Sequence, residues 1–330
     1  TPRCKHMVST YSEAGVDIDA SERATEALIA QIKGVNRKGD GESIKLDNGF
    51  AGLVKLGDGA LAMCTDGVGS KILLAEEMDS IHTVGIDCVA MNTNDLICVG
   101  AEPLSFVDYV ALDKPDEELM AKIGKGLAEG CRQSNCTLSG GETAILPELV
   151  HGFDIAGTSV GYVKQNEIID GTKIAEGDVL IGLKSSGPHS NGYTLIRKLF
   201  DGDKDIGKQL VEPTRIYVKE VMDLIEQVNV HGIAHITGGG LDNISRINDN
   251  FQYVIDNPLP VPSVFDWLQE KGNIEGKEMY RTFNMGMGMI IVVDKNDAKK
   301  SISILGEYAQ IIGSVKNGKG VKHSRLILGS

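Results

Sequence analysis

Residues 83–99 read TVGIDCVAMNTNDLICV, and this stretch decides how the first half of the chain folds. Apolar residues fill most of its positions at helical spacing, which predicts a largely buried helix. Strand-like segments flank it at residues 60–65 and 104–112, and an amphipathic helix is predicted over residues 116–133. Helix and strand are interleaved in both halves of the chain without strict βαβ order, which indicates α+β domains.

The helix predicted at residues 83–99 carries carboxylate and amide side chains among its apolar ones. Asp87 and Asn94 are seven positions apart and therefore share a face, with Asp95 one position round. Burying a carboxylate costs free energy unless the group is paired or bound to a metal. A solvated stripe is the alternative, but few other charges lie on this helix. We favour a functional role for this face.

Length and composition indicate a globular protein of two domains. The chain has 330 residues, more than the roughly 250–300 at which single cores stop growing. The composition turns polar around residues 164–177, so we expect domains at residues 1–164 and 165–330. A hydrophobic content of 42% excludes a disordered chain. Glycine accounts for 40 of the 330 residues, about 12% of the chain against a usual share of about 7%. This excess indicates loops that approach ligands closely.

Charge and cysteine content narrow the class of protein further. The chain has 33 Lys and Arg against 46 Asp and Glu, and this net charge of −13 argues against a non-specific nucleic-acid binder. No apolar run approaches the roughly 18–20 residues of a membrane span, and residues 1–10 lack the apolar core of a signal peptide. Six cysteines without a CxxC pair fit a reduced, cytoplasmic protein in which they hold neither metal nor disulfide.

A glycine-containing segment at residues 46–53 is the first candidate for ligand binding. Gly49 and Gly52 flank Phe50, and two glycines three positions apart can present backbone N–H groups to an anion. A hairpin turn around Asn48 and Gly49 is the alternative interpretation.

Residues 65–71 read TDGVGSK and directly follow a predicted strand. Asp66 offers a hard oxygen ligand, Gly67 permits close backbone approach, and Lys71 supplies a positive charge, which together suit a Mg²⁺–phosphate site. A tight turn with a solvent-facing lysine is the alternative. Asp66 and Asp95 could share a Mg²⁺ that bridges nucleotide phosphates.

Two more glycine segments follow short predicted strands. One holds Gly140, Gly141 and Glu142, and the other is the triple glycine at residues 238–240, which precedes a short helix. A helix N-terminus preceded by glycines can bind an anion. Taken alone, each segment is better explained as a plain turn between a strand and a helix.

Residues 185–193 read SSGPHSNGY and connect a predicted strand to a predicted helix. The loop offers hydroxyl and amide donors for a phosphate or sugar, and His189 titrates near neutrality. A surface histidine is the alternative, and no nearby Asp–His pattern supports a serine nucleophile. The candidate binding residues are Ser185, Ser186, Gly187, His189, Ser190 and Asn191.

Together these segments resemble the aminoimidazole ribonucleotide synthetases, also called phosphoribosylformylglycinamidine cyclo-ligases, of purine biosynthesis. The resemblance runs nearly end to end and includes every segment discussed above. The motifs that carry it are YSEAGVDID at 11–19, DGVGSK at 66–71, GIDCVAMN at 85–92, NDL at 94–96, GAEP at 100–103, GGETA at 140–144, SSGPHSNGY at 185–193, EPTRIYV at 212–218, HITGGG at 235–240 and FNMGMGM at 283–289.

The resemblance implies an ATP- and Mg²⁺-dependent ring closure of formylglycinamidine ribonucleotide to 5-aminoimidazole ribonucleotide. In that chemistry ATP phosphorylates the formyl amide oxygen, the amidine nitrogen attacks the same carbon, and ADP and phosphate are released. The family's fold is an N-terminal ferredoxin-like, chorismate-mutase-like sheet domain that forms a homodimer, followed by a C-terminal α+β sandwich domain.

The same resemblance assigns roles to individual residues. The ribose-phosphate side of the substrate is expected at the 185–193 loop and at Gly238, Gly239 and Gly240, and the catalytic candidates are His189, Lys71 and Asp66, with Asp66 and Asp95 as metal ligands. The nucleotide side is expected at Gly49, Phe50, Gly52, Asp66, Gly67, Lys71, Asp87, Asn94, Asp95, Gly140, Gly141 and Glu142.

Two departures from the family pattern lie in the second half. Residues 201–210 form a shorter stretch than expected for a bacterial member, and residues 241–246 are one residue short and lack the usual proline before arginine. These departures concern substrate contacts and leave the nucleotide side intact.

Relatives with the same architecture define the alternatives. Selenophosphate synthetase needs a reactive cysteine or selenocysteine that residues 45–56 lack, and the hydrogenase-maturation dehydratase acts through a C-terminal cysteine, whereas the last cysteine here is Cys136. Thiamine-monophosphate kinase lacks the GPHSNG loop. An inactive nucleotide-binding regulatory subunit would be expected to have lost some of the candidate residues, which are all present.

Overall fold

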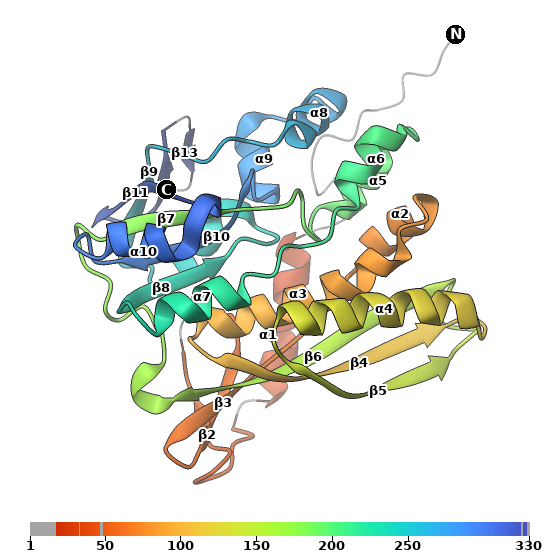
Figure 1. The fold of residues 1–330 in the computed structure, drawn as a ribbon, viewed down its shortest axis with the longest axis horizontal. Coiled ribbons are helices and arrows are strands. Elements are labelled where there is room, and N and C mark those ends of the chain that lie inside the picture. The colour runs from red at the N-terminus through yellow and green to blue at the C-terminus, as the bar shows by residue number, and fades with distance from the viewer. Residues whose placement is uncertain (1–17, 33, 47–48, 325, 329–330) are drawn as a thin grey trace.

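The computed structural model describes residues 18–32, 34–46, 49–324 and 326–328. The first family motif, most of which precedes residue 18, and the turn residue Asn48 lie outside this part of the chain. The strands form two sheets of six and seven strands, with helices on each, so the predicted α+β class is confirmed (Figure 1). In the part that the structure describes, no helix is long and apolar enough to cross a membrane.

The first sheet belongs to the N-terminal half. Its strands β4 and β5 are parallel, and all its other neighbours are antiparallel. In spatial order the strands are β1 (Ser43–Ile44), β2 (Gly52–Leu56), β3 (Gly59–Gly67), β6 (Phe153–Lys164), β4 (Glu102–Leu112) and β5 (Thr137–Ile145).

Helices α3 (Ile81–Cys98) and α4 (Glu117–Gln133) cover one face of this sheet (Figure 1). The two helices touch through their backbones at Gly85 and Gly126, where any side chain would collide with the opposite helix. Helix α4 begins where the Asp116 carboxylate accepts a hydrogen bond from the Leu119 amide at 2.9 Å. The remaining helices of this half are α1 (Ile18–Ile32) and α2 (Lys71–Glu77).

The opposite face of the first sheet carries exposed apolar side chains. Val107 and Tyr109 on β4 are 39% and 43% exposed. Met63, Leu104, Leu138 and Ile145 on the same sheet are also large, apolar and exposed. Figure 1 shows helices α3 and α4 on the other side of these strands.

The second sheet is built from the C-terminal half. Its strands in spatial order are β13 (Leu326–Leu328), β12 (Gly320–His323), β9 (Phe251–Ile255), β11 (Ala309–Asn317), β7 (Val179–Lys184), β10 (Met287–Val293) and β8 (Val230–His235). Its helices are α5 (Tyr193–Leu199), α6 (Lys204–Leu210), α7 (Val218–Ile225), α8 (Ser263–Gly272), α9 (Gly276–Thr282) and α10 (Ala298–Leu305), with 3-10 turns η1 (Gln165–Glu167), η2 (Gly240–Arg246) and η3 (Gly306–Tyr308).

Helix α3 lies between the two halves of the molecule. It contacts β3 and β6 of the first sheet and also α7 and β8 of the second half. The largest cluster of buried apolar residues therefore runs without a break from the first half to the second, and includes Ile97 on α3, Val221 on α7 and Ile233 on β8. A helix enclosed on all sides needs apolar residues all round, as the sequence of α3 has.

Two local predictions were wrong, and short helices were missed. Pro213 suits the first turn of a helix and predicts one that runs to about Val228, but α7 begins at Val218, because residues 212–217 lie outside regular structure and hydrogen-bond to α3. The short strand expected near residues 136–139 continues to Ile145, so Gly140–Glu142 lie within a strand and not in a loop after it. Helices α6 and α9 were not predicted, because each spans only seven residues and gives little periodic signal.

Candidate active site

The polar residues of α3 form two clusters at the junction of the two halves. We call the group around Lys71, Asp87 and Asn94 the closed cluster and the group around Asp66 and Asp95 the open cluster. Both receive partners from the second half of the chain, which the helical spacing alone did not predict.

In the closed cluster, the ammonium group of Lys71 is fully enclosed and all its hydrogen-bond donors are used. It lies 2.9 Å from the Asp87 carboxylate and 2.7 Å from each of the backbone carbonyls of His189 and Glu212. Asp87 also accepts hydrogen bonds from the backbone and hydroxyl of Thr214, at 2.7 and 2.6 Å. Burial lowers the pKa of Lys71, and the adjacent Asp87 opposes that shift.

Asn94 completes the closed cluster about two turns further along the helix than Asp87. Its side-chain amide donates to the Arg215 carbonyl at 2.9 Å, and its oxygen accepts from the Tyr217 backbone at 3.0 Å. Asn94 is thus both donor and acceptor to the backbone of one segment, as a neighbouring strand would be. These two hydrogen bonds hold residues 212–217 against α3.

The open cluster contains the carboxylates of Asp66 and Asp95, and neither forms an ion pair with a lysine or arginine among the described residues. Asp66 stands at the end of β3, where it accepts a hydrogen bond from the Gly67 backbone at 2.8 Å. Burial raises the pKa of Asp66, and the Asp95 carboxylate adds to the increase. The protonated thiol of Cys64 donates to Asp95 at 3.7 Å, because burial and the nearby carboxylates raise its pKa. Two such carboxylates would bind a cation favourably.

His235 joins the open cluster from the second half. It ends β8, is fully buried, and places Nδ1 2.8 Å from Oδ1 of Asp95. In the sequence, His235 stands out only as the first residue of the HITGGG motif, and no role was predicted for it. Its position at the end of a strand, three residues before the triple glycine begins, was the available signal.

A row of residues across the first sheet extends the open cluster toward β5. Asp66 lies opposite Gly157 on β6, which lies opposite Asp108 on β4, which in turn lies opposite Gly141 on β5. At about 4.8 Å per strand, Gly141 is roughly 14 Å from Asp66 along this row. Burial raises the pKa of Asp108. The predicted residues Gly140–Glu142 thus lie in register with the open cluster, and Asp108 is a carboxylate that sequence reasoning missed.

The 185–193 loop crosses above α3, and its three serines are bound within the protein. Ser185 donates to Asn284 at 2.9 Å, Ser186 to the Pro213 carbonyl at 2.6 Å, and Ser190 lies 3.0 Å from the Thr214 hydroxyl. The hydroxyl groups expected to bind a phosphate therefore shape the loop in this structure.

Two other nitrogens of the loop are buried and have no partner among the described residues. They are Nδ1 of His189 and Nδ2 of Asn191. Asn191 faces the triple glycine, since a side chain on Gly238 would contact its amide oxygen. Unpaired buried polar atoms cost free energy, so a pair of them beside a glycine turn indicates a ligand.

His189 has the conformation of a constrained residue. Its φ angle is +62°, a left-handed value that non-glycine residues rarely adopt. It accepts a hydrogen bond from the Ser186 backbone at Nε2, 3.3 Å away. Burial lowers the pKa of His189 well below its ordinary value. Because Nε2 accepts a hydrogen bond, the neutral ring carries its proton on Nδ1.

The Gly49–Gly52 loop is closed by the second half of the chain. Arg246, the last residue of η2, donates to the Gly49 carbonyl at 2.6 Å and stacks 4.2 Å above the Phe50 ring. Gly239 and Gly240 both have positive φ angles and lead into η2. The Gly49 loop and the triple glycine thus meet at one turn, and Arg246 is a further residue that sequence reasoning missed.

The open cluster fits a magnesium ion that a nucleotide shares. Among the described residues, no three His, Cys, Asp or Glu side chains are grouped to hold a metal by themselves. Asp66 and Asp95 are hard oxygen donors whose repulsion a cation would relieve, and Mg²⁺ typically takes one or two carboxylates plus phosphate oxygens and water. The donor set therefore suits Mg²⁺ with a phosphate ligand.

Comparisons with known proteins agree with the two-part architecture. Residues 49–163 match the family model described as AIR synthase related protein, N-terminal domain, and residues 175–324 match the corresponding C-terminal domain. These matches define the class: an AIR-synthase-related protein with both of its domains.

Curated relatives narrow the class to one family. The phosphoribosylformylglycinamidine cyclo-ligase of Methanosarcina acetivorans is 45% identical over 98% of this chain and 99% of its own length. That of Methanocaldococcus jannaschii is 44% identical over 96% of this chain and 95% of its own. The chain belongs to the phosphoribosylformylglycinamidine cyclo-ligase family, which confirms the sequence prediction of a ligase of purine biosynthesis.

Solved structures show the same fold at low identity. A ThiL protein complexed with AMPPCP and TMP matches with a TM-score of 0.64 and 15% identity over 100% of this chain and 97% of its own. A hydrogenase maturation protein HypE in complex with ATP matches with a TM-score of 0.60 and 19% identity over 89% and 87%.

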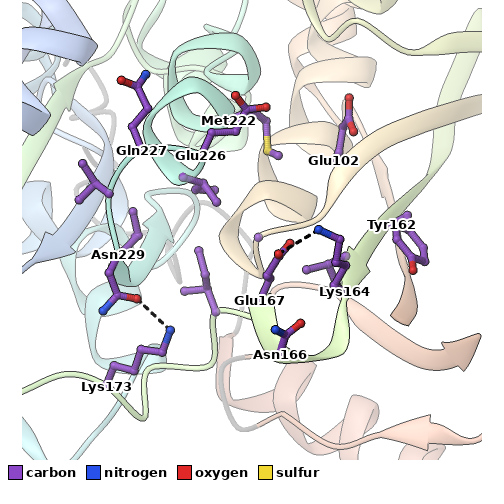
Figure 2. Close-up of a pocket in the computed structure, with 16 residues that line it drawn as sticks. Glu102, Tyr162, Lys164, Asn166, Glu167, Lys173, Met222, Glu226, Gln227 and Asn229 are labelled. Carbon is purple, nitrogen blue, oxygen red and sulfur yellow. Dashed lines mark hydrogen bonds and ion pairs between the residues drawn. The ribbon is translucent and has the colours of Figure 1, made fainter. Parts of the chain in front are cut away.

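A separate cavity of about 870 Å³ lies where the end of β6 and η1 face α7 and β8. Figure 2 shows its polar walls, on which Lys164 bonds to Glu167 and Lys173 to Asn229. None of the predicted site residues lines it.

Proposed function

We propose that the chain closes the imidazole ring of 5-aminoimidazole ribonucleotide from formylglycinamidine ribonucleotide, with conversion of ATP to ADP and phosphate. The observation that carries this proposal is the meeting of the open cluster, the 185–193 loop and the triple glycine at one junction. These segments are far apart in the sequence, and each supplies a kind of group that the reaction requires.

The open cluster is the proposed metal and nucleotide side. Asp66 and Asp95 would hold Mg²⁺, and the Gly67 backbone and the Gly49–Gly52 loop would approach the phosphates. The row through Asp108 to Gly140–Glu142 extends this side along the sheet. ATP supplies the phosphoryl group that turns the formyl oxygen into a leaving group, and Mg²⁺ neutralises the charge of its phosphates.

The 185–193 loop and Gly238–Gly240 are the proposed substrate side. The unpartnered Nδ2 of Asn191 would donate to the substrate, and Nδ1 of His189, which carries the ring proton because Nε2 accepts from the Ser186 backbone, would hold or donate a proton near the reacting atoms. Lys71 was predicted to bind phosphate. Its donors are all used, so we propose that it acts through the His189 carbonyl, by fixing the loop that bears the catalytic candidate.

We also propose that the protein is a homodimer, formed through the exposed apolar face of the first sheet. For the single chain we propose a ferredoxin-like arrangement of the first domain and a division between the domains at residues 164 and 165. A contiguous exposed apolar face on a sheet supports an interface. Asp in place of Val107 should turn a dimer into a monomer by light scattering. Leu149→Asp, at a residue that is 79% exposed in the connection between β5 and β6, is the control and should leave the mass unchanged. A monomeric wild type would refute the proposal.

The activity itself is tested by ADP release from Mg·ATP with and without formylglycinamidine ribonucleotide, alongside appearance of the imidazole product. One ADP per product, strictly dependent on substrate, is expected. ADP release without ring closure would favour the related small-molecule kinases, and tight ATP binding without turnover would favour an inactive regulatory subunit.

A further inference from the structure

His235 is held rigidly by the second sheet and has little freedom of its own. It pairs with Met289 of β10 in the β ladder and is fully buried. Its ring packs 6.4 Å from that of His189. A residue fixed in this way can orient another group but does not move to follow it.

The hydrogen bonds of Asn94 assign the protonation of the His235 ring. Because the Tyr217 backbone donates to the Asn94 oxygen, the nitrogen of that amide faces the other way, toward the Arg215 carbonyl and Nε2 of His235 at 3.5 Å. An amide nitrogen only donates, so Nε2 is the acceptor and the ring proton sits on Nδ1. Nδ1–H therefore points at Asp95.

The two oxygens of Asp95 are oriented from two different domains. Oδ1 accepts from His235 at 2.8 Å, and Oδ2 accepts from the Cys64 thiol on β3 at 3.7 Å. The short bond comes from the second domain and the long, weak one from the first. The Asp95 side chain keeps 19% of its surface exposed, so the carboxylate remains accessible while its direction is set by His235.

We propose that His235 is a positioning residue that holds the Asp95 carboxylate in the orientation needed to bind the metal. The second domain thereby sets the geometry of a metal ligand that belongs to the first. This inference rests on the proposed function, since it assigns Asp95 to the metal. Groups that orient a metal ligand from behind typically change metal affinity or activity about 10–100-fold when removed.

The chain offers a matched control on the same strand. His231, four residues earlier on β8, places its Nδ1 2.7 Å from Asp178, within the second domain. Replacing either histidine by alanine removes one His–Asp hydrogen bond from β8. Only His235→Ala removes one that reaches α3.

Two amide substitutions separate the hydrogen bond from the bulk of the ring. The side-chain nitrogen of asparagine can replace Nδ1 of histidine, whereas that of glutamine corresponds to Nε2. His235→Asn should therefore restore the bond to Asp95, and His235→Gln should not. Both variants keep a polar side chain of similar size in the same buried position.

The experiment measures Mn²⁺ binding by electron paramagnetic resonance, with AMPPCP present and no turnover. The Mn²⁺ dissociation constant should rise about 10–100-fold for His235→Ala and His235→Gln, stay close to wild type for His235→Asn, and be unchanged for His231→Ala. Equal Mn²⁺ affinity in wild type and His235→Gln would overturn the inference, as would equal weakening in the Asn and Gln variants.

If His235→Ala fails to fold, the difference in Mn²⁺ affinity between the Asn and Gln variants is sufficient to test the positioning role of His235. The outcome is also independent of the ring-closure assay. A wild-type protein that binds Mn²⁺ with AMPPCP but forms no imidazole would refute the proposed reaction and leave the role of His235 standing. A wild-type protein that forms the imidazole while His235→Gln binds Mn²⁺ normally would refute only the role of His235.

Discussion

The closed and open clusters share one helix but have opposite electrostatic character. In the closed cluster, Lys71 and Asp87 are wholly buried and compensate each other, and their remaining hydrogen bonds go to the 212–217 segment and the 185–193 loop. In the open cluster, Asp66 and Asp95 have no lysine or arginine partner among the described residues, and burial raises the pKa of Asp66.

This difference shows that the same residue types can stabilise the fold in one cluster and remain available for chemistry in the other. A buried ion pair whose ammonium protons are all bonded within the protein holds two parts of a chain together, and its lysine has no donor left for a ligand. A carboxylate pair with no lysine or arginine partner can still bind a cation. The closed cluster should therefore determine stability and the open cluster turnover.

The largest expected effect comes from breaking the closed cluster. Lys71→Met leaves Asp87 buried and unpaired, which should lower the free energy of unfolding by about 3–5 kcal/mol. Lys122→Met is the control, because Lys122 makes ion pairs with Asp79 and Glu118 at the surface and should lose less than about 1 kcal/mol. Urea denaturation measures both. Equal losses in the two variants would remove the distinction between the clusters.

A somewhat smaller effect, on a different observable, is expected from the open cluster. Asp95→Asn keeps an oxygen that accepts from His235 but loses the charge, so kcat should fall about 10²–10³-fold, as it does when one preorganised electrostatic contact is lost. The urea midpoint should stay at the wild-type value, and Asp66→Asn should behave alike. A variant with near-normal turnover would exclude its residue from the metal site.

The smallest effect concerns the pH dependence of stability. Because the pKa of His189 is lowered in the folded state, the unfolded chain binds a proton below about pH 6.5 that the folded chain refuses. The stability from this group is complete above that pH and is lost as the pH falls, by up to about 1.4 kcal/mol per pH unit.

His189→Asn tests this assignment, since asparagine tolerates the positive φ angle better than most residues. Between pH 7.5 and 5.5, the variant should lose less free energy of unfolding than the wild type, as measured by urea denaturation at each pH. Parallel losses in the two proteins would show that His189 takes up its proton freely in the folded state.

The sequence predicted the regular elements well where hydrophobic periodicity was strong. Helix α3, helix α4 and strand β4 lie within two residues of the expected bounds at each end. Short helices were missed because seven residues give little periodic signal. The 212–217 segment was missed because its structure depends on Asp87 and Asn94, which are more than 100 residues away in the sequence.

For the candidate site, the sequence identified the residues but not which of them are available to a ligand and which are enclosed by other parts of the chain. Lys71 and Asp66 are five residues apart in one motif, yet one is enclosed by the second half of the chain and the other is not. Nothing in local spacing distinguishes them, since the distinction comes from His189, Thr214 and His235, contributed by other strands and loops. Asp108 and Arg246 were missed for the same reason.

The unbroken apolar cluster that runs through α3 has a thermodynamic consequence. If one domain of the chain unfolded alone, the other would expose its part of the shared apolar core to water. The two domains should therefore unfold together on heating. Calorimetry should record a single transition in which the van't Hoff and calorimetric enthalpies agree for each protomer. The protein is then two domains by architecture but one cooperative unit in unfolding.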